Sequence, residues 1–307
     1  MNSKASSASG SPGAGVALSS LSGRNLLSLD EDVFRARFDR RPFTISHDLV
    51  DHPLLTLPSL IELSKRLPEG NIRYNRGDVP AGQQLYLAPK TELSIEETIR
   101  QIEHCGSWMV IRFVEQDPAY RELLNQCLDE IQPLCERVSP GMFRREGFVF
   151  ISSPGSVTPF HADPEHNFLL QIRGKKTANL FDVADRSIVS EEVLEKYLCG
   201  APFKSPFKDE HQEKAFVFDL RPGDGLHFPL NWPHWVKNGD EVSISFSITF
   251  RTQESERREI VYKVNNYLRK RAINPRPYGQ SRLIDSAKFY AFRAARRTNS
   301  LVSRNPE

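Results

Sequence analysis

The sequence has no long apolar run, and its charges nearly cancel over 307 residues. No run approaches the roughly 18–20 residues that a membrane-spanning helix needs. The start of the chain lacks a charged stretch followed by an apolar core, so we expect no secretory signal. With 41 basic and 39 acidic residues, the chain as a whole is not drawn to nucleic acid. These absences favour a cytoplasmic protein with no membrane partner.

Cysteine is also scarce. The four cysteines, Cys105, Cys127, Cys135 and Cys199, show no CxxC spacing. Paired spacings of that kind are typical of zinc sites and redox motifs. We therefore predict structural thiols in a reducing compartment and no zinc site.

The first half of the chain is predicted to be mainly helical. Residues 1–24 are rich in Ser, Ala and Gly, and we expect a disordered tail because they cannot bury enough apolar area. Residues 25–143 predict a mixed helical region that packs on a barrel, with Pro133 expected to kink or end the longest helix early. The predicted helices of this region span residues 30–38, 57–67, 94–104 and 117–138, and its predicted strands span 43–49 and 108–114.

The pattern changes at residue 144. From 144 to 252, short β-type runs alternate with Gly, Pro, Asn and Asp, which is typical of a sandwich or barrel. A helix is predicted to interrupt them at 190–197. Residues 253–307 return to helix and are rich in Lys and Arg, which we interpret as a solvated helical face.

The chemistry is carried by His161 and Asp163. In an extended strand, residues two apart point to the same face, so this imidazole and carboxylate can bind one metal ion. They are two thirds of the two-histidine, one-carboxylate set of Fe(II) sites. For the third ligand we favour His234, at a strand start on the far side of the barrel, over its rival His227. His166 does not have a ligand spacing, and we interpret it as a residue of the rim or of the second shell around the metal.

Two further residues suggest what the metal would work with. Lys176 ends an apolar strand run, and if its ammonium faces the barrel interior it can pair with a carboxylate. Thr158 could add a hydroxyl to the same carboxylate. A 2-oxo acid that chelates iron would need such an anchor at its far end.

These residues resemble a known family, the JmjC-type, cupin-fold 2-oxoglutarate-dependent oxygenases. The segment is most similar to the branch that contains the asparaginyl hydroxylase inhibiting hypoxia-inducible factor. The matching residues are Thr158, Pro159, His161, Asp163, Asn167, Gln171, Ile172, Gly174 and Lys176, then Gly223, Asp224, Pro229, Trp232 and His234.

The resemblance implies a mainly β fold with flanking helices around a double-stranded β-helix, the jelly roll of cupins. It also implies a dioxygenase that uses O₂, turns 2-oxoglutarate into succinate and CO₂, and hydroxylates a protein side chain or small molecule. Demethylation would be the same chemistry on an N-methyl carbon. Fe(II) would be bound by His161, Asp163 and His234, with no catalytic residue beyond this centre.

The co-substrate would be bound by Lys176 through a salt bridge, by a hydrogen bond from Thr158, and by Asn167. Ser247 stands where the family often has an Asn near the co-substrate.

Two alternatives remain open at this stage. The first is a metal-binding cupin that is non-catalytic or does not use 2-oxoglutarate, and acts as a binding module. The second concerns the C-terminal helices. Their apolar stripe from Ile260 to Ile273 fits the homodimer interface of the family, whereas their basic residues could contact nucleic acid or an acidic protein.

Overall fold

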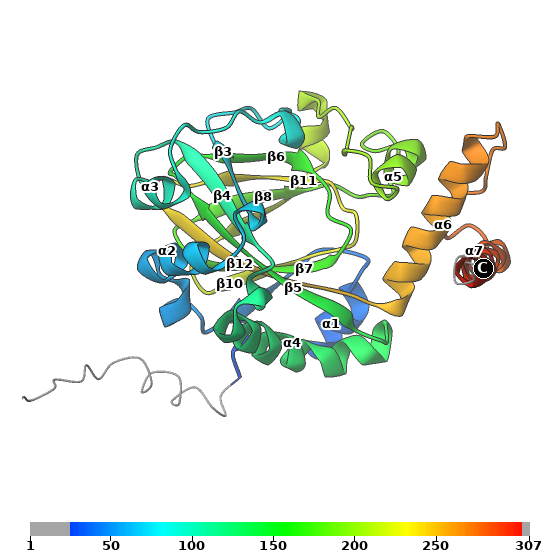
Figure 1. Cartoon of the computed structure of the whole chain (residues 1–307), viewed down its shortest axis with the longest axis horizontal. Helices are drawn as coiled ribbons and strands as arrows, with labels where there is room; N and C mark the ends of the chain where they lie inside the picture. Colours follow the sequence, from blue (N-terminus) through cyan, green and yellow to red (C-terminus); the bar gives the residue numbers. More distant parts are fainter. Residues whose placement is uncertain (1–24, 303–307) are drawn as a thin grey trace, which may run out of the picture.

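The computed structural model describes residues 25–302, with side chains as far as Arg296, so the predicted tail over residues 1–24 lies outside it. Its centre consists of two antiparallel sheets (Figure 1). The larger has eight strands in the order β1-β2-β10-β7-β12-β5-β4-β3, and the smaller has four in the order β6-β11-β8-β9. This is the expected jelly-roll arrangement of mostly antiparallel sheets with flanking helices.

The predicted strands of the barrel are all present. The eight-stranded sheet contains β1 (Leu27–Ser28), β2 (Phe43–His47), β3 (Ile72–Arg76), β4 (Ser107–Arg112), β5 (Phe143–Ser152), β7 (His166–Arg173), β10 (Asp224–Phe228) and β12 (Ser243–Arg251). The four-stranded sheet contains β6 (Val157–His161), β8 (Lys176–Leu180), β9 (Phe216–Leu220) and β11 (His234–Asn238). The larger sheet continues across residue 144, because β1 to β4 come from the predicted helical half.

The helices begin where the sequence supplies caps. The α-helices are α1 (Glu31–Arg37), α2 (Leu57–Arg66), α3 (Ile95–Arg100), α4 (Pro118–Val138), α5 (Glu191–Tyr197), α6 (Gln253–Arg269) and α7 (Arg282–Val302). Side-chain oxygens accept first-turn N–H groups at the starts of α1 to α6, from Asp30, Thr56, Ser94, Asp117, Ser190 and Thr252. Such caps satisfy donors that have no partner within the helix.

One expectation about the helices was wrong. We predicted that Pro133 would kink its helix or end it early, and the early end is contradicted because α4 continues through it to Val138. Ile131 and Cys135, on either side of the proline, are buried in the main core. Packing of this face offsets the hydrogen bond that proline cannot donate.

The period of two along β7 separates the two faces of the larger sheet. Phe168 and Leu170 belong to the large core that includes residues of α1, α2 and α4, and α1 and α4 lie along one side of the sheet (Figure 1). Asn167 and Leu169 point to the opposite face, where the smaller sheet closes a second core. The site therefore lies between the sheets.

A tight turn joins the strands that carry the site. Gly174 lies between β7 and β8 at φ +67°, and a Cβ there would come within 2.5 Å of the Val242 carbonyl oxygen. Only glycine fits this turn without strain. The run that we expected to end at Lys176 is thus two strands, and Lys176 begins the second.

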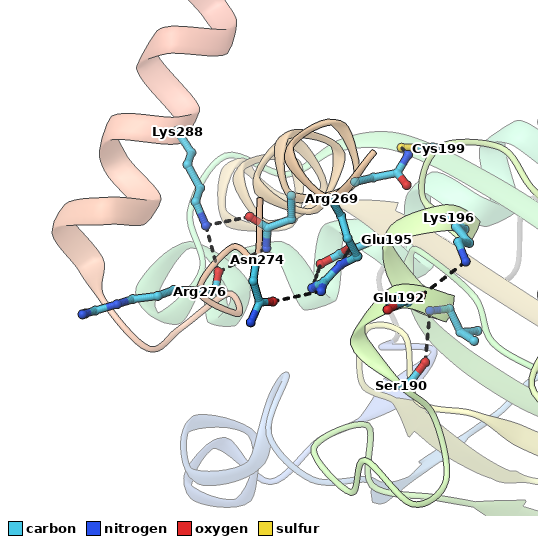
Figure 2. Close-up of polar contacts among 12 residues, drawn as sticks. Ser190, Glu192, Glu195, Lys196, Cys199, Arg269, Asn274, Arg276 and Lys288 are labelled. Carbon is cyan, nitrogen blue, oxygen red and sulfur yellow. Dashed lines mark hydrogen bonds and ion pairs between the residues drawn. The ribbon is translucent and has the colours of Figure 1, made fainter. Parts of the chain in front are cut away.

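The C-terminal helices are fastened to the inserted helix α5. The Arg269 guanidinium of α6 donates to both Glu195 carboxylate oxygens, at 2.8 and 3.0 Å. Lys288 of α7 donates to Asn265 of α6 and to the Arg276 carbonyl (Figure 2). The prediction of a solvated basic face was therefore wrong for the side chains that pack inward, such as Arg269.

The structure also bears on membrane spanning and on the cysteines. No helix between residues 25 and 302 has the length and hydropathy to cross a membrane. All four cysteines are free thiols, with Cys127 and Cys135 buried.

Candidate metal centre

Three side chains converge at one end of the barrel. The Asp163 carboxylate lies 3.9 Å from His161 Nε2 and 3.6 Å from His234 Nε2. The three ligand atoms all lie within 4.8 Å of one another. Among the residues that the structure describes, no other group of three histidine, cysteine or acidic side chains is so arranged.

Main-chain contacts fix the orientation of both rings. His161 Nδ1 lies 2.7 Å from the Pro159 carbonyl oxygen, and His234 Nδ1 lies 2.9 Å from that of Trp232. A carbonyl only accepts, so each Nδ1 carries the proton and donates it. Each Nε2 is then left with a free lone pair on the side of Asp163. This is the tautomer that a metal needs, held before any metal arrives.

The electrostatics keep His234 neutral. Burial lowers the pKa of His234 to about 4, assisted by the neighbouring His161 and opposed by Asp163. The ring is therefore uncharged at neutral pH and available as a ligand. Two nitrogens and one carboxylate oxygen form a donor set that suits first-row divalent metals and leaves further coordination positions open.

The route by which the third ligand arrives differs from our expectation. We placed His234 on the far side of the barrel, facing the first two ligands across the interior. Instead β11 pairs directly with β6, and His234 lies opposite His161 in that pairing. The ring centroids are 4.2 Å apart. Asp163 lies just after β6 rather than within it.

The predicted co-substrate residues meet the triad in one cavity. Thr158, Asn167 and Lys176 line it together with all three metal candidates, and it spans about 370 Å³ of space between atoms, part of it open to solvent. The apolar part of its wall, Phe150, Leu169, Phe228 and Val236, was not predicted. The period of two leads from Asn167 to Leu169 and from His234 to Val236, so it could have indicated two of these four.

Lys176 is a buried cation at this cavity. Its residue is 6% exposed, and burial lowers the pKa of its ammonium to about 7. Within residues 25–302 no carboxylate forms an ion pair with it. A buried ammonium without a counter-charge is costly, and an anion in the cavity would relieve that cost.

Ser247 contacts a residue that lines the cavity but does not line the cavity itself. It is buried on β12, and its hydroxyl donates to the Asn167 side-chain oxygen at 2.7 Å. This bond leaves the Asn167 amide nitrogen free to face the cavity. Ser247 thus orients Asn167.

His227 and His166 belong to a different environment. His227 is fully buried, with Phe43 at 4.8 Å and Phe168 at 4.9 Å between ring centroids. His166 is 1% exposed and stacks on Phe38 at 4.6 Å, so interpreting it as a rim residue was wrong. Both point to the helix-covered face because their neighbours in sequence face the cavity.

Tyr197 was not predicted as a residue of the site. It ends α5, and its hydroxyl donates to the Ala162 carbonyl oxygen at 2.6 Å. Ala162 lies between the two metal candidates of the His-x-Asp run. The two residues are 35 positions apart in the sequence, so no local sequence pattern predicts their contact.

Comparisons with known proteins agree with this architecture. Residues 110–256 match the family described as "Cupin-like domain". The matched stretch has the double-sheet fold described above and is similar to that family. It contains every residue assigned above to the metal and co-substrate site.

Curated relatives are similar to a part of the chain. Lysine-specific demethylase 8 of Xenopus tropicalis is 32% identical over 104 residues, which is 31% of this chain and 22% of the relative. HSPB1-associated protein 1 of Bos taurus is 26% identical over 138 residues, covering 42% and 28%. The chain thus spans about a quarter of the length of these curated relatives.

Solved structures extend the likeness to nearly the whole chain. A structure of YcfD, a ribosomal oxygenase from Escherichia coli, in complex with cobalt and 2-oxoglutarate, aligns with a TM-score of 0.51. The alignment covers 92% of this chain and 69% of that one, at 16% identity. At this identity the likeness establishes the fold.

Proposed function

We propose that the protein is an Fe(II)- and 2-oxoglutarate-dependent oxygenase. The observation that carries the proposal is the shared cavity, which brings a two-histidine, one-carboxylate set and a buried lysine together. When bound, Fe(II) and 2-oxoglutarate activate O₂ so that one oxygen atom enters a substrate C–H bond, with succinate and CO₂ as co-products.

The protein's own part begins with the metal. His161, Asp163 and His234 would hold the ion, and the carbonyls of Pro159 and Trp232 keep both rings aimed at it. Among the described residues, the donor set consists of these three side chains. The remaining positions stay open for the co-substrate and O₂.

The co-substrate would lie along the cavity with its far carboxylate at Lys176. The ammonium supplies the charge, and Thr158 lines the same cavity to donate a hydrogen bond. Asn167, held by Ser247, would contact the co-substrate between these ends. The apolar wall excludes water, which strengthens each of these contacts.

The reaction that we favour is hydroxylation of a protein side chain or small molecule. The motif residues from Thr158 to Lys176 support placement near the asparaginyl hydroxylase branch. A relative named as a lysine-specific demethylase supports N-demethylation as the variant outcome. The four free cysteines suit the reducing cytoplasm, where we place the protein.

The metal assignment is tested by anaerobic purification with Fe(II), followed by iron content and succinate formation. A double His161→Ala, Asp163→Ala variant is expected to lose both. His104→Ala is the matched control, since this ring is on the surface. Continued 2-oxoglutarate turnover by the double variant would refute the site.

The co-substrate assignment is tested separately at Lys176. Lys176→Ala is expected to keep its iron and to bind 2-oxoglutarate about 30-fold more weakly, which corresponds to about 2 kcal/mol for a lost buried charge contact. Lys175→Ala, one residue away and exposed, should bind as the parent does. Equal affinity of the two variants would reject 2-oxoglutarate as the ligand of this cavity.

We also infer a homodimer through the C-terminal helices. Their described surface exposes large apolar side chains, with Leu283 84%, Tyr290 67% and Tyr267 54% exposed. Leu283→Glu combined with Tyr290→Glu should convert a dimer to a monomer in analytical ultracentrifugation. A parent chain that sediments as a monomer would contradict the inference.

A further inference from the structure

A second, much larger depression lies along β3. This basic groove is lined by three cations, Arg73, Lys90 and Arg112, and by the single carboxylate of Glu69, with about 1130 Å³ of space between atoms, part of it open to solvent. Its floor includes Tyr74 of β3. Charge of one sign therefore dominates the lining.

Carbonyl oxygens, and no carboxylate among the described residues, hold the two guanidiniums of this groove. Arg112 donates to the carbonyls of Gly70 (2.7 Å) and Asn71, and Arg73 donates to that of Leu85. Carbonyls hold a guanidinium in place but leave its net charge. Across residues 25–302, none of the groove's three cations forms an ion pair.

The environment of Arg73 disfavours its positive charge. Burial lowers the pKa of the Arg73 guanidinium, and repulsion from Arg112 lowers it further. By contrast, Arg76 at the end of the same strand pairs with Asp78. Two like charges held close without a counter-ion favour an incoming anion.

The basic groove continues toward the metal centre. Arg73 and Tyr86 line both the groove and a neighbouring pocket, and that pocket also contains His161 and Asp163. The walls of this connecting pocket are aromatic, formed by Phe160, Tyr197 and Phe203. A molecule lying in the groove can thus extend a side chain between aromatic rings to the metal.

The shape of the groove fits an extended chain. β3 is the last strand of the eight-stranded sheet and has β4 on one side only (Figure 1). An edge strand offers backbone groups along which an extended peptide can lie. The Arg76 N–H already donates to the Pro89 carbonyl at 2.8 Å, so the peptide would lie along the part of β3 before Arg76.

We propose that the basic groove binds an acidic, extended peptide segment of the substrate, whose neighbouring target side chain enters the connecting pocket. This inference rests on the proposed oxygenase function for the fate of that side chain. Glu69 favours a peptide over a nucleic acid, because contiguous phosphates would meet its carboxylate whereas a peptide carries its charges only at some positions.

The proposal is tested by fluorescence anisotropy with the full chain. The probes are labelled peptides of alternating Gly and Glu, the same peptides with Gln or Lys in place of Glu, and a single-stranded RNA of similar length. Arg112→Gln is the groove variant. Lys270→Gln is the matched control, because it removes one exposed positive charge at the end of α6.

We expect the Glu peptide to bind more tightly than the Gln and Lys peptides. We also expect about fivefold weaker binding in Arg112→Gln and no change in Lys270→Gln. Equal binding of the Glu and Gln peptides, equal losses in both variants, or no binding at millimolar peptide would overturn the proposal. Tighter RNA binding that Arg112→Gln abolishes would replace the peptide with a nucleic acid.

The oxygenase function is read out independently of this groove. Substrate-free 2-oxoglutarate decarboxylation should be unchanged in Arg112→Gln, and peptide binding should be unchanged in the metal-free chain. If the parent chain does not decarboxylate 2-oxoglutarate, the oxygenase proposal is rejected, whereas the peptide-binding proposal for the groove is unaffected. Absent peptide discrimination in an active parent would reject the groove alone.

Discussion

The ion pair between Arg269 and Glu195 predicts that removing the arginine destabilises the protein more than removing the glutamate. The Glu195 side chain is 1% exposed, whereas that of Arg269 is 25% exposed. Arg269→Leu leaves the buried Glu195 carboxylate without its cationic partner, which should lower the free energy of unfolding by about 3–5 kcal/mol. Glu195→Leu leaves an arginine that can turn toward water, and we expect a loss of about 1–2 kcal/mol. The double replacement should be close to neutral.

The measurement is the free energy of unfolding in urea, combined with amide hydrogen exchange of α5 and α6. Exchange should rise in both helices for Arg269→Leu, because the pair joins them (Figure 2). Arg271→Leu is the control, since its guanidinium lies over the exposed Tyr267 ring and meets no carboxylate among the described residues. Equal costs for the two single variants, or a double variant that costs their sum, would refute the reasoning.

Three further predictions concern the site and the core. Removing the Tyr197 hydroxyl in Tyr197→Phe should weaken Co(II) binding about fivefold in a titration, for about 1 kcal/mol of lost hydrogen bond, while Tyr290→Phe on the exposed surface should not. Burial lowers the pKa of Lys176 to about 7, and a bound carboxylate would raise it again. The 2-oxoglutarate affinity should therefore be constant below pH 7 and fall above it, and calorimetry of Lys176→Met should lose this dependence. Burial also holds the pKa of His227 well below 6.5, so the unfolded chain takes up the proton first. The contribution of neutral, buried His227 to the free energy of unfolding is therefore fully present above pH 6.5 and declines below it, by about 2 kcal/mol at pH 5. His227→Phe should remove this loss, and an unchanged difference between pH 7 and pH 5 in urea unfolding would contradict the burial argument.

The sequence predicted the barrel well because its signals are local. Alternation of apolar and polar residues marks each strand, and side chains such as Asp117 and Ser190 mark helix starts. The same locality explains the miss at Pro133, where packing of α4 against the core outweighs the local cost of a proline. The edge strand β3 was missed because it is only five residues long and contains just two apolar side chains, Ile72 and Tyr74, which is too little alternation to mark a strand.

The metal and co-substrate residues could be predicted because their spacing follows strand geometry and a recognisable motif. What the sequence could not supply was strand pairing. His234 reaches the site because β11 lies beside β6, and a list of strands does not state which ones are neighbours. For the same reason, His227 could be excluded as a ligand only from the structure, in which its side chain lies on the face of β10 that packs against Phe43 and Phe168.

The contacts that lie farthest apart in sequence also decide how rigid the centre is. The Ala162 carbonyl is held by Tyr197 at the end of α5, and α5 is held by Arg269 of α6. Each contact crosses tens of residues, so the His-x-Asp run is positioned by a helix inserted in the barrel and by one that follows it. A change confined to α6 should therefore alter metal affinity without touching a ligand. Arg269→Leu tests this directly, because it should weaken Co(II) binding in the same direction as Tyr197→Phe, and combining the two should add little once the link through α5 is already broken.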